Sequence, residues 1–208
     1  MPATALSPPE SRPADAAPHP GDAREHELIA RICRRERLAF EALYRLYHPR
    51  LTRFLQRMLR PTHLVEEVLD DALYVVWSHP ERFDGSSRVS TWIFAIAYRK
   101  ALKALSRHDE PQEWQDDDEP MRAGHDQLSA DVPEDRLGHA QLQRALRQAM
   151  STLSVEQRAA VELTYFHGFS YPEIAAVVDC PVDTVKTRMF HARRRLKAAL
   201  GGRSGDWL

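Results

Sequence analysis

Residues 170–190 read SYPEIAAVVDCPVDTVKTRMF and hold two short helical patterns separated by a tight turn. Ser170 and Glu173 have the spacing of a capping box, in which the two residues satisfy free N–H groups at the start of a helix. Pro172 lies in the first turn of this helix, where its missing N–H costs little. These signals predict a short helix that ends at about Val178.

Residues 171–190 have the spacing of a helix-turn-helix. Two helices that cross at a steep angle need a small residue at the crossing, a tight turn and apolar anchors. Ala175 falls at the crossing and Val185 supplies an anchor. Asp179 falls at the turn, where glycine is usual but where Asp tolerates a positive φ better than most residues. Pro181 and Asp183 suit the start of the second helix, because of the fixed φ of proline and the helix dipole.

The second helix separates into two faces. Residues at helical spacing form an apolar face that we expect to be buried, namely Val185, Met189, Ala192, Leu196 and Ala199. The opposite face presents basic, hydrogen-bonding and aromatic side chains, namely Lys186, Thr187, Phe190, His191, Arg193, Arg194 and Lys197. Such a set suits the major groove of DNA, where Lys and Arg read guanine or phosphate and an apolar group touches the thymine methyl. The alternative is a solvated basic face, which would leave Phe190 exposed without a role.

Two more helices are predicted upstream of this motif. Apolar residues at helical spacing predict the first one, namely Leu142, Ala145, Leu146, Ala149, Met150 and Leu153. A second capping box, Ser154-Val155-Glu156-Gln157, opens the next helix, and Gly168 closes it. Residues 137–208 are therefore expected to form a four-helix unit.

Residues 25–108 are predicted to be helical throughout. One long buried face is formed by Phe40, Leu43, Tyr44, Tyr47, Leu51, Phe54, Leu55, Met58 and Leu59. After a break at Pro61, an amphipathic helix is predicted by Val65, Val68, Leu69, Ala72, Leu73, Val76 and Trp77. A loop at residues 84–87 precedes another helical stretch that runs to about Leu105. The alternation typical of β-strands does not occur, so the fold class is expected to be all-α.

Charge is distributed unevenly along the 208 residues, whose formal net charge is −1. Residues 25–108 carry 15 basic and 10 acidic groups, and residues 137–208 carry 10 and 6. Residues 109–136 carry 2 and 11, which predicts an extended acidic linker. Residues 1–24 hold 6 of the 14 prolines and few large apolar side chains, which predicts disorder. We therefore expect two small helical domains, the second with the helix-turn-helix, joined by a flexible acidic linker.

The sequence argues against several classes of function. Cys33 and Cys180 are too few for a disulfide framework, which favours a reducing, cytoplasmic environment over a redox role for either thiol. No apolar run approaches the roughly 18 residues of a membrane span, and the N-terminus lacks the pattern of a signal peptide. Metal-ligand pairs, a Gly-rich phosphate loop and a nucleophile constellation are not seen either. We expect no metal, no cofactor and no catalysis.

The C-terminal motifs resemble region 4 of the extracytoplasmic-function (ECF) sigma factors, small bacterial members of the sigma-70 family. The similar segments are Leu153–Arg158, Gly168–Ala175 and Pro181–Arg188. The family usually has Gly where Asp183 stands and Ser where Thr187 stands, and it often has Arg in place of His191. The resemblance implies that the second helix reads the minus-35 promoter element through Lys186, Thr187, Arg188, Phe190, His191, Arg193 and Arg194.

The predicted helix at residues 65–77 has an acidic face. This face consists of Glu66, Glu67, Asp70 and Asp71. Like charges four residues apart destabilise a helix by roughly 0.2–0.5 kcal/mol per pair, so a basic partner would stabilise the face. A solvated face is the alternative. Residues 64–77 are similar to sigma region 2.2, with Asp70 where a Gln is common, and this implies docking on the clamp helices of the RNA polymerase β′ subunit.

Residues 83–93 read FDGSSRVSTWI and precede a basic helical stretch that also includes Arg107. Cations along one side of a helix can track phosphates, and a polar loop can hydrogen-bond a base pulled from the stack. Trp92 either packs in the core or supports an unstacked base. The segment is similar to sigma regions 2.3 and 2.4, although Asn is often found where Arg99 stands. The resemblance implies that the minus-10 element is read and melted by Ser86, Ser87, Arg88, Trp92, Arg99, Lys100 and Lys103.

The two resemblances together imply an ECF sigma factor that directs promoter-specific initiation. Its implied partners are core RNA polymerase through the β′ and β subunits, duplex promoter DNA, the melted minus-10 strand and a cognate anti-sigma factor. The linker is then either a solvated tether or a mimic of nucleic acid in the polymerase channel. One alternative is a helix-turn-helix regulator that binds duplex DNA but not core polymerase. Another is an enzyme that uses carboxylates such as Glu66 and Asp70.

Overall fold

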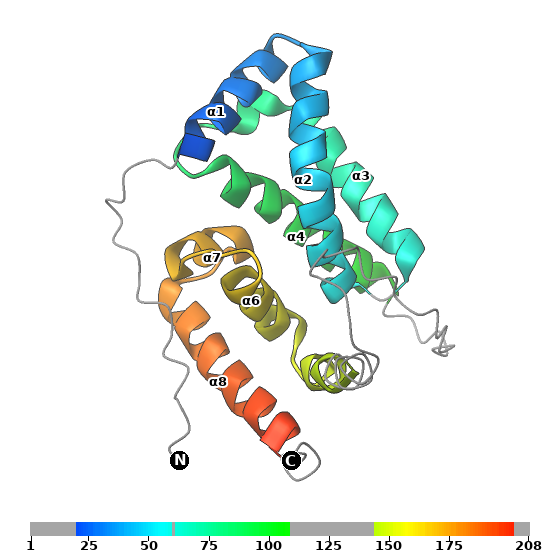
Figure 1. Cartoon of the computed structure of the whole chain (residues 1–208), viewed down its shortest axis with the longest axis vertical. Helices are drawn as coiled ribbons and strands as arrows, with labels where there is room; N and C mark the ends of the chain where they lie inside the picture. Colours follow the sequence, from blue (N-terminus) through cyan, green and yellow to red (C-terminus); the bar gives the residue numbers. More distant parts are fainter. Residues whose placement is uncertain (1–19, 60, 109–143, 202–208) are drawn as a thin grey trace, which may run out of the picture.

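The computed structural model describes residues 20–59, 61–108 and 144–201, and the regular secondary structure of these residues is entirely helical (Figure 1). The first part, here called the N-terminal block, contains α1 (Pro20–Cys33), α2 (Arg37–Met58), α3 (Thr62–Ser78), a short 3-10 helix η1 (Pro80–Arg82) and α4 (Val89–His108). The second part, the C-terminal block, contains a helical segment at 144–151, then α6 (Val155–Tyr165), α7 (Tyr171–Val178) and α8 (Val182–Gly201). The all-α prediction is confirmed.

The core of the N-terminal block follows the predicted periodicity. Positions three and four residues apart lie on one side of a helix, and in α2 they are buried at Ala39, Leu43, Tyr47, Leu51, Phe54, Leu55 and Met58. The helix continues through Pro49, which lies on its exposed side. In α3 the buried residues are Leu64, Val65, Val68, Leu69, Ala72, Leu73 and Val76. None of the helices within residues 20–59, 61–108 and 144–201 is long and apolar enough to cross a membrane.

Helix α1 corrects one expectation from the sequence. The composition of residues 1–24 predicts disorder, but α1 already begins at Pro20, with Asp22 in its first turn. Proline has a φ that suits the first turn of a helix, and an acidic residue there interacts favourably with the helix dipole. Leu28, Ile29 and Ile32 then bury the apolar side of α1 in the core. Residues 1–19 and the predicted linker at 109–136 lie outside the described residues.

Local signals define the C-terminal block. The capping boxes at Ser154 and Ser170 are both present, and they start α6 and α7. Gly168 follows α6 with a φ of 70°, in the left-handed region that favours glycine. Asp179 ends α7 with φ 51° and ψ 59°, so the turn of the helix-turn-helix adopts the predicted left-handed conformation. Cys180 N–H donates to the carbonyl of Ala175 at 3.1 Å and closes this turn.

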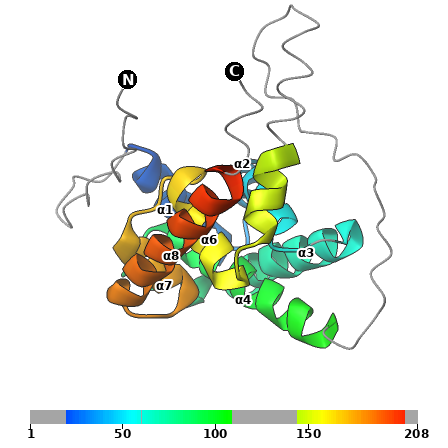
Figure 2. The same ribbon diagram turned by 90° about the horizontal axis from the view of Figure 1, so that it is seen from below.

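The two blocks share one continuous core. Helix α4 packs against α7, and α2 packs against α6 (Figures 1 and 2). Phe94 of α4 is fully buried, and its ring lies 5.3 Å from that of Phe54 and 5.1 Å from that of Phe169 in the C-terminal block. The His167 ring adds an edge contact 4.8 Å from Phe94. The apolar seam formed by these four rings holds the helix-turn-helix against α4.

Candidate nucleic-acid and polymerase interface

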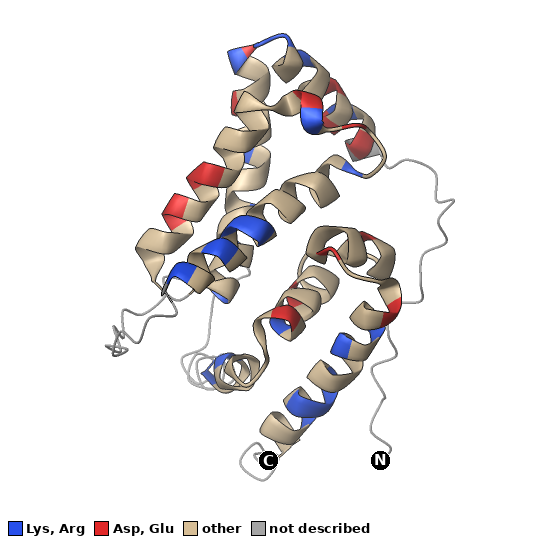
Figure 3. Ribbon diagram, turned by 180° about the vertical axis from the view of Figure 1, so that it is seen from behind, with Lys and Arg blue, Asp and Glu red and all other residues tan. Residues whose placement is uncertain are grey.

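The recognition helix α8 has the two faces that its sequence predicts. Val185, Met189 and Ala192 are fully buried, while Leu196 and Ala199 are half-buried. The solvent side exposes five of the seven predicted minus-35 residues, namely Lys186, Thr187, Phe190, His191 and Arg194. Figure 3 shows the basic residues that follow one another along α8. Phe190 is 63% exposed, so this face combines cationic side chains with a large apolar group in the way a DNA major groove requires.

Two predicted minus-35 residues turn inward instead. Arg188 is half-buried, and its Nη1 lies 3.5 Å from the Cys180 sulfur in the turn. Arg193 is also half-buried, and its Nη2 donates to the hydroxyl of Tyr171 at the start of α7. These contacts fasten α8 to the turn and to the first helix of the motif. In this conformation Arg188 and Arg193 therefore support the helix-turn-helix from within.

A basic cavity of about 520 Å³ lies in the N-terminal block between α3, η1 and α4. It brings together four of the predicted minus-10 residues, Trp92, Arg99, Lys100 and Lys103. Val75, Arg82 and Ile96 complete its lining. Trp92 is half-buried and its ring lies 5.4 Å from the Phe83 ring, so it both packs in the fold and forms part of the cavity wall. Cations around an aromatic wall suit a nucleotide, with its phosphate and its stacking base.

Arg82 is the cavity residue that sequence reasoning missed. It lies in η1, outside the helical stretch to which the sequence assigns minus-10 contacts. In the sequence, Arg82 is a single arginine in a short segment between two predicted helices, and no neighbouring pattern marks it as a DNA-binding residue. Its place in the cavity lining with Arg99 and Lys103 depends on how η1 packs against α1 and α3, which the sequence pattern does not predict.

The loop before α4 holds the other three predicted minus-10 residues apart from the cavity. Ser86 is exposed, and both its N–H and its hydroxyl donate to Asp84, at 2.9 and 2.6 Å. These two hydrogen bonds lower the pKa of Asp84 and fix the loop as a compact turn. The hydroxyl of Ser87 donates to the carbonyl of Arg88 at 3.4 Å. The Arg88 side chain is occupied by two carboxylates from other parts of the fold.

The predicted polymerase-docking residues form one exposed acidic surface on α3. Glu66, Glu67, Asp70 and Asp71 all face solvent, and Tyr74 extends the surface by one turn with 66% exposure. Figure 3 shows this acidic stripe next to the basic residues of α4. Lys100 Nζ pairs with Asp71 Oδ2 at 2.8 Å, so the acidic surface and the basic cavity meet at a single ion pair.

Two ionisable groups lie where the blocks meet, Glu162, which is buried, and His167, which is half-buried. The Glu162 carboxylate is almost completely buried, with Arg57 Nε at 3.8 Å, and within the described part of the chain neither of its oxygens accepts a hydrogen bond. Burial raises the pKa of Glu162 to about 7, against the opposing effect of Arg57 and Arg158. Burial also lowers the pKa of His167 to about 4, and Arg50 and Arg53 add to this effect. Neither group could be recognised from sequence, because Glu162 lies among the ordinary helical positions of α6 and His167 lies in the turn that follows this helix.

The described ranges contain both cysteines of the chain. No group of three or more His, Cys, Asp or Glu side chains is arranged there to hold a metal ion. Cys33 is exposed and Cys180 is half-buried, and both are free thiols.

Each block matches a known protein family. The family described as Sigma-70 region 2 matches residues 43–110, and the one described as Sigma-70, region 4 matches residues 143–196. The ECF RNA polymerase sigma factor RpoE of Cereibacter sphaeroides is 33% identical over 168 residues, which cover 78% of this chain and 87% of that protein. The RNA polymerase sigma-H factor of Pseudomonas aeruginosa is 26% identical over 181 residues, 85% of this chain and 94% of the relative.

A solved structure has the same fold. The sigma factor RpoE from Bartonella quintana, in complex with the anti-sigma factor NepR, superposes with a TM-score of 0.56 and 25% identity. The match covers 78% of this chain and 96% of that one. The order of the two matched regions, the relative of 33% identity and the shared fold lead to one conclusion: the chain belongs to the ECF family of RNA polymerase sigma factors.

Proposed function

We propose that this sigma factor uses its N-terminal block to bind core polymerase and to open the minus-10 element, and its C-terminal block to read the minus-35 element. The observation that carries this assignment is the basic cavity beside the acidic surface of α3. A regulator that only binds duplex DNA needs neither feature.

The acidic surface of α3 suits a basic docking partner. Glu66, Glu67 and Asp70 repel one another along an exposed face, and a cationic surface would relieve that repulsion. Charge complementarity of this kind speeds association and fixes orientation. The clamp helices of the β′ subunit are the proposed partner, with additional contacts to the β subunit.

The basic cavity suits a nucleotide of the melted minus-10 strand. Its volume of about 520 Å³ lies within the range of small-molecule sites, and its wall offers Trp92 for stacking. Arg82, Arg99 and Lys103 supply positive charge for the flanking phosphates. Unstacking a base costs a few kcal/mol, and stacking and hydrogen bonding in such a pocket offset this cost.

The exposed face of α8 suits the duplex minus-35 element. Lys186 and Arg194 are exposed and can reach phosphates or guanine edges, and Phe190 is placed to contact a thymine methyl. The protein would thus act in the cytoplasm by binding rather than by catalysis. An anti-sigma factor would hold it inactive, and in support of this the Bartonella quintana relative was solved in complex with the anti-sigma factor NepR.

In vitro transcription of sheared genomic DNA tests this function. Core polymerase with the protein should start RNA synthesis at a set of shared promoters. Initiation no greater than with core polymerase alone would contradict it. A helix-turn-helix regulator, the alternative, would instead protect duplex DNA from cleavage and would not co-purify with β′.

A further inference from the structure

Helix α1 contacts both ends of the loop that precedes α4. Asp22 and His26 are four residues apart, so they lie on the same side of α1, one turn from each other. Asp22 contacts one end of the loop at residues 83–88, and His26 contacts the other end. Helix α1 lies before residues 43–110, which match Sigma-70 region 2, so this match assigns it no role.

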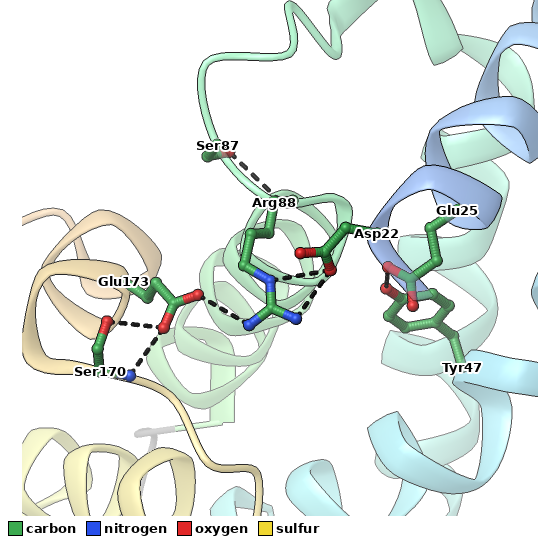
Figure 4. Close-up of polar contacts among 7 residues, drawn as sticks. All are labelled: Asp22, Glu25, Tyr47, Ser87, Arg88, Ser170 and Glu173. Carbon is green, nitrogen blue, oxygen red and sulfur yellow. Dashed lines mark hydrogen bonds and ion pairs between the residues drawn. The ribbon is translucent and has the colours of Figure 1, made fainter. Parts of the chain in front are cut away.

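The Arg88 end of the loop is held by an ion pair (Figure 4). Nη2 and Nε of Arg88 lie 2.8 and 3.1 Å from Oδ1 of Asp22, whose side chain is only 15% exposed. Nη1 also contacts Glu173 of the C-terminal block at 3.2 Å, but both partners of the Asp22 ion pair belong to the N-terminal block. The backbone carbonyl of Arg88 accepts the N–H of Trp92 at 3.1 Å. Asp22 is therefore linked through Arg88 to the aromatic wall of the basic cavity.

The Phe83 end of the loop is held by aromatic contacts. The centroid of the His26 ring lies 5.2 Å from that of Phe83, and the Phe83 ring lies 5.4 Å from that of Trp92. Tilted rings at such distances attract one another. Phe83 directly follows η1, which supplies Arg82 to the cavity, so the same contacts also fix the end of η1.

Helix α1 is itself anchored in the N-terminal block. Leu28, Ile29 and Ile32 bury its apolar side in the core. Its other anchor is polar, because the hydroxyl of Tyr47 on α2 donates to Glu25 at 2.6 Å (Figure 4). The side chains that reach the loop therefore project from a helix whose own position is fixed.

The middle of the loop is ordered by its own residues. Asp84 accepts the N–H and the hydroxyl of Ser86, and Gly85 has a φ of 77°, in the left-handed region that favours glycine. This turn keeps its shape without help from the rest of the fold. Its placement beside the cavity is set at the two ends of the loop, where α1 makes its contacts.

We propose that α1 is a positioning element of the minus-10 site, in which Asp22 and His26 hold the loop and the Trp92 wall in the arrangement that receives the melted strand. The proposal rests on the proposed function and adds to it two residues that act through the loop and the wall rather than by contact with DNA. A site that is ordered before binding spends no binding free energy on its own ordering. Loss of either residue should therefore weaken DNA binding although no contact to DNA is removed. Arg88 serves here as the anchor of the loop.

Binding of holoenzyme to fork-junction promoter DNA tests the proposal. Asp22→Asn and His26→Ala should each bind about two- to tenfold more weakly than the wild type, the range expected for the loss of one ion pair or one ring contact. The salt dependence of binding should stay unchanged, because neither residue neutralises a phosphate. His26→Phe keeps a ring beside Phe83 and should bind like the wild type. The control is Glu27→Ala, an exposed residue of α1, which should also bind normally.

An unchanged affinity of either Asp22→Asn or His26→Ala would overturn the proposal. Tighter binding of Asp22→Asn with a steeper salt dependence would overturn it as well, since Asp22 would then compete with phosphates for Arg88. Circular dichroism should show the same helix content in all proteins. If Asp22→Asn alone loses helix content, His26→Ala decides the outcome, because the His26 side chain is exposed and its removal leaves the core intact.

A spectroscopic readout in the free, full-length protein separates this proposal from the proposed function. 5-Fluorotryptophan labels the four tryptophans of the chain, and the signal lost in Trp92→Phe identifies the fluorine resonance of Trp92. Asp22→Asn and His26→Ala should shift or broaden this resonance, and Glu27→Ala should leave it in place. A Trp92 resonance that is the same in all of these proteins would overturn the proposal. Absence of promoter binding by every holoenzyme, the wild type included, would contradict the proposed function, while the resonance would still decide whether α1 positions the cavity wall.

Discussion

Lys100 and Asp71 form an ion pair of 2.8 Å at the line where the acidic surface of α3 meets the basic cavity of α4. Two surfaces of opposite charge, one suited to a protein and one to DNA, are therefore set side by side by the packing of two helices. The proposed polymerase-docking site and the proposed DNA-opening site would thus be neighbours in one small domain.

The acidic surface should dominate binding to core polymerase. Replacing Glu67 and Asp70 by Lys places like charges against the basic partner, and we expect affinity to fall about tenfold or more. Glu41→Lys, an exposed charge reversal on α2, serves as the control and should bind normally. Fluorescence anisotropy with labelled protein measures the affinity of both variants for core polymerase. An equal loss of affinity in Glu41→Lys would show that overall charge, rather than the α3 surface, determines binding.

Arg82 should take part in minus-10 binding although it lies outside the basic helix. Arg82→Gln removes one phosphate partner from the cavity, so we expect about threefold to tenfold weaker binding of holoenzyme to a fork-junction promoter DNA. The salt dependence of binding should also fall by about one unit of slope. Arg24→Gln on α1 is the matched control. An unchanged salt slope in Arg82→Gln would remove this residue from the DNA interface.

Neighbouring residues of α8 should separate recognition from stability. Phe190 is exposed, so Phe190→Ala should leave the melting temperature unchanged and weaken minus-35 duplex binding about fivefold. Met189 is fully buried, so Met189→Ala should lower the free energy of unfolding by about 2–5 kcal/mol. Thermal melts measure the stability of both variants, and duplex-binding titrations of the holoenzymes measure their affinity for minus-35 DNA. Tyr165→Ala, another exposed aromatic, should affect neither property.

Stability should depend on pH through Glu162. Its pKa is about 7 in the folded protein, where burial outweighs Arg57 and Arg158, against an ordinary value of 4.5. The folded state therefore binds this proton more tightly than the unfolded state. Its contribution to stability is fully present below pH 4.5 and is lost as the pH rises through about 7.

Glu162→Gln mimics the protonated carboxyl at every pH. At pH 8 this variant should be more stable than the wild type by at most roughly 3 kcal/mol, as the size of the pKa shift implies. At pH 4.5 the two proteins should unfold at nearly the same urea concentration. A constant difference between them at both pH values would show that Glu162 does not titrate in this range.

Prediction from sequence succeeded where the signals were local. The capping boxes at Ser154 and Ser170, the left-handed Asp179 and the apolar stripe of α3 each depend on residues only a few positions apart. The five exposed residues of α8 also follow from helical spacing alone. Such patterns are decided within one helix or one turn, so tertiary packing does not alter them.

Contacts between distant residues could not be predicted from the sequence. Asp22 and Glu173 pair with Arg88 from 66 and 85 positions away. The contacts of Arg188 with Cys180 and of Arg193 with Tyr171 depend on how α8 packs against the rest of the motif. Pro20–Arg24 has the composition of a disordered segment, but Asp22 gains a partner only in the folded chain.

The most direct measurement is in vitro transcription of genomic DNA by core polymerase, with the RNA 5′ ends mapped by sequencing. With wild-type protein, the ends should cluster downstream of a common pair of minus-35 and minus-10 sequences, and the Glu67→Lys/Asp70→Lys variant should lose these ends. An unchanged set of ends with and without the wild-type protein would contradict its role as a promoter-recognition subunit.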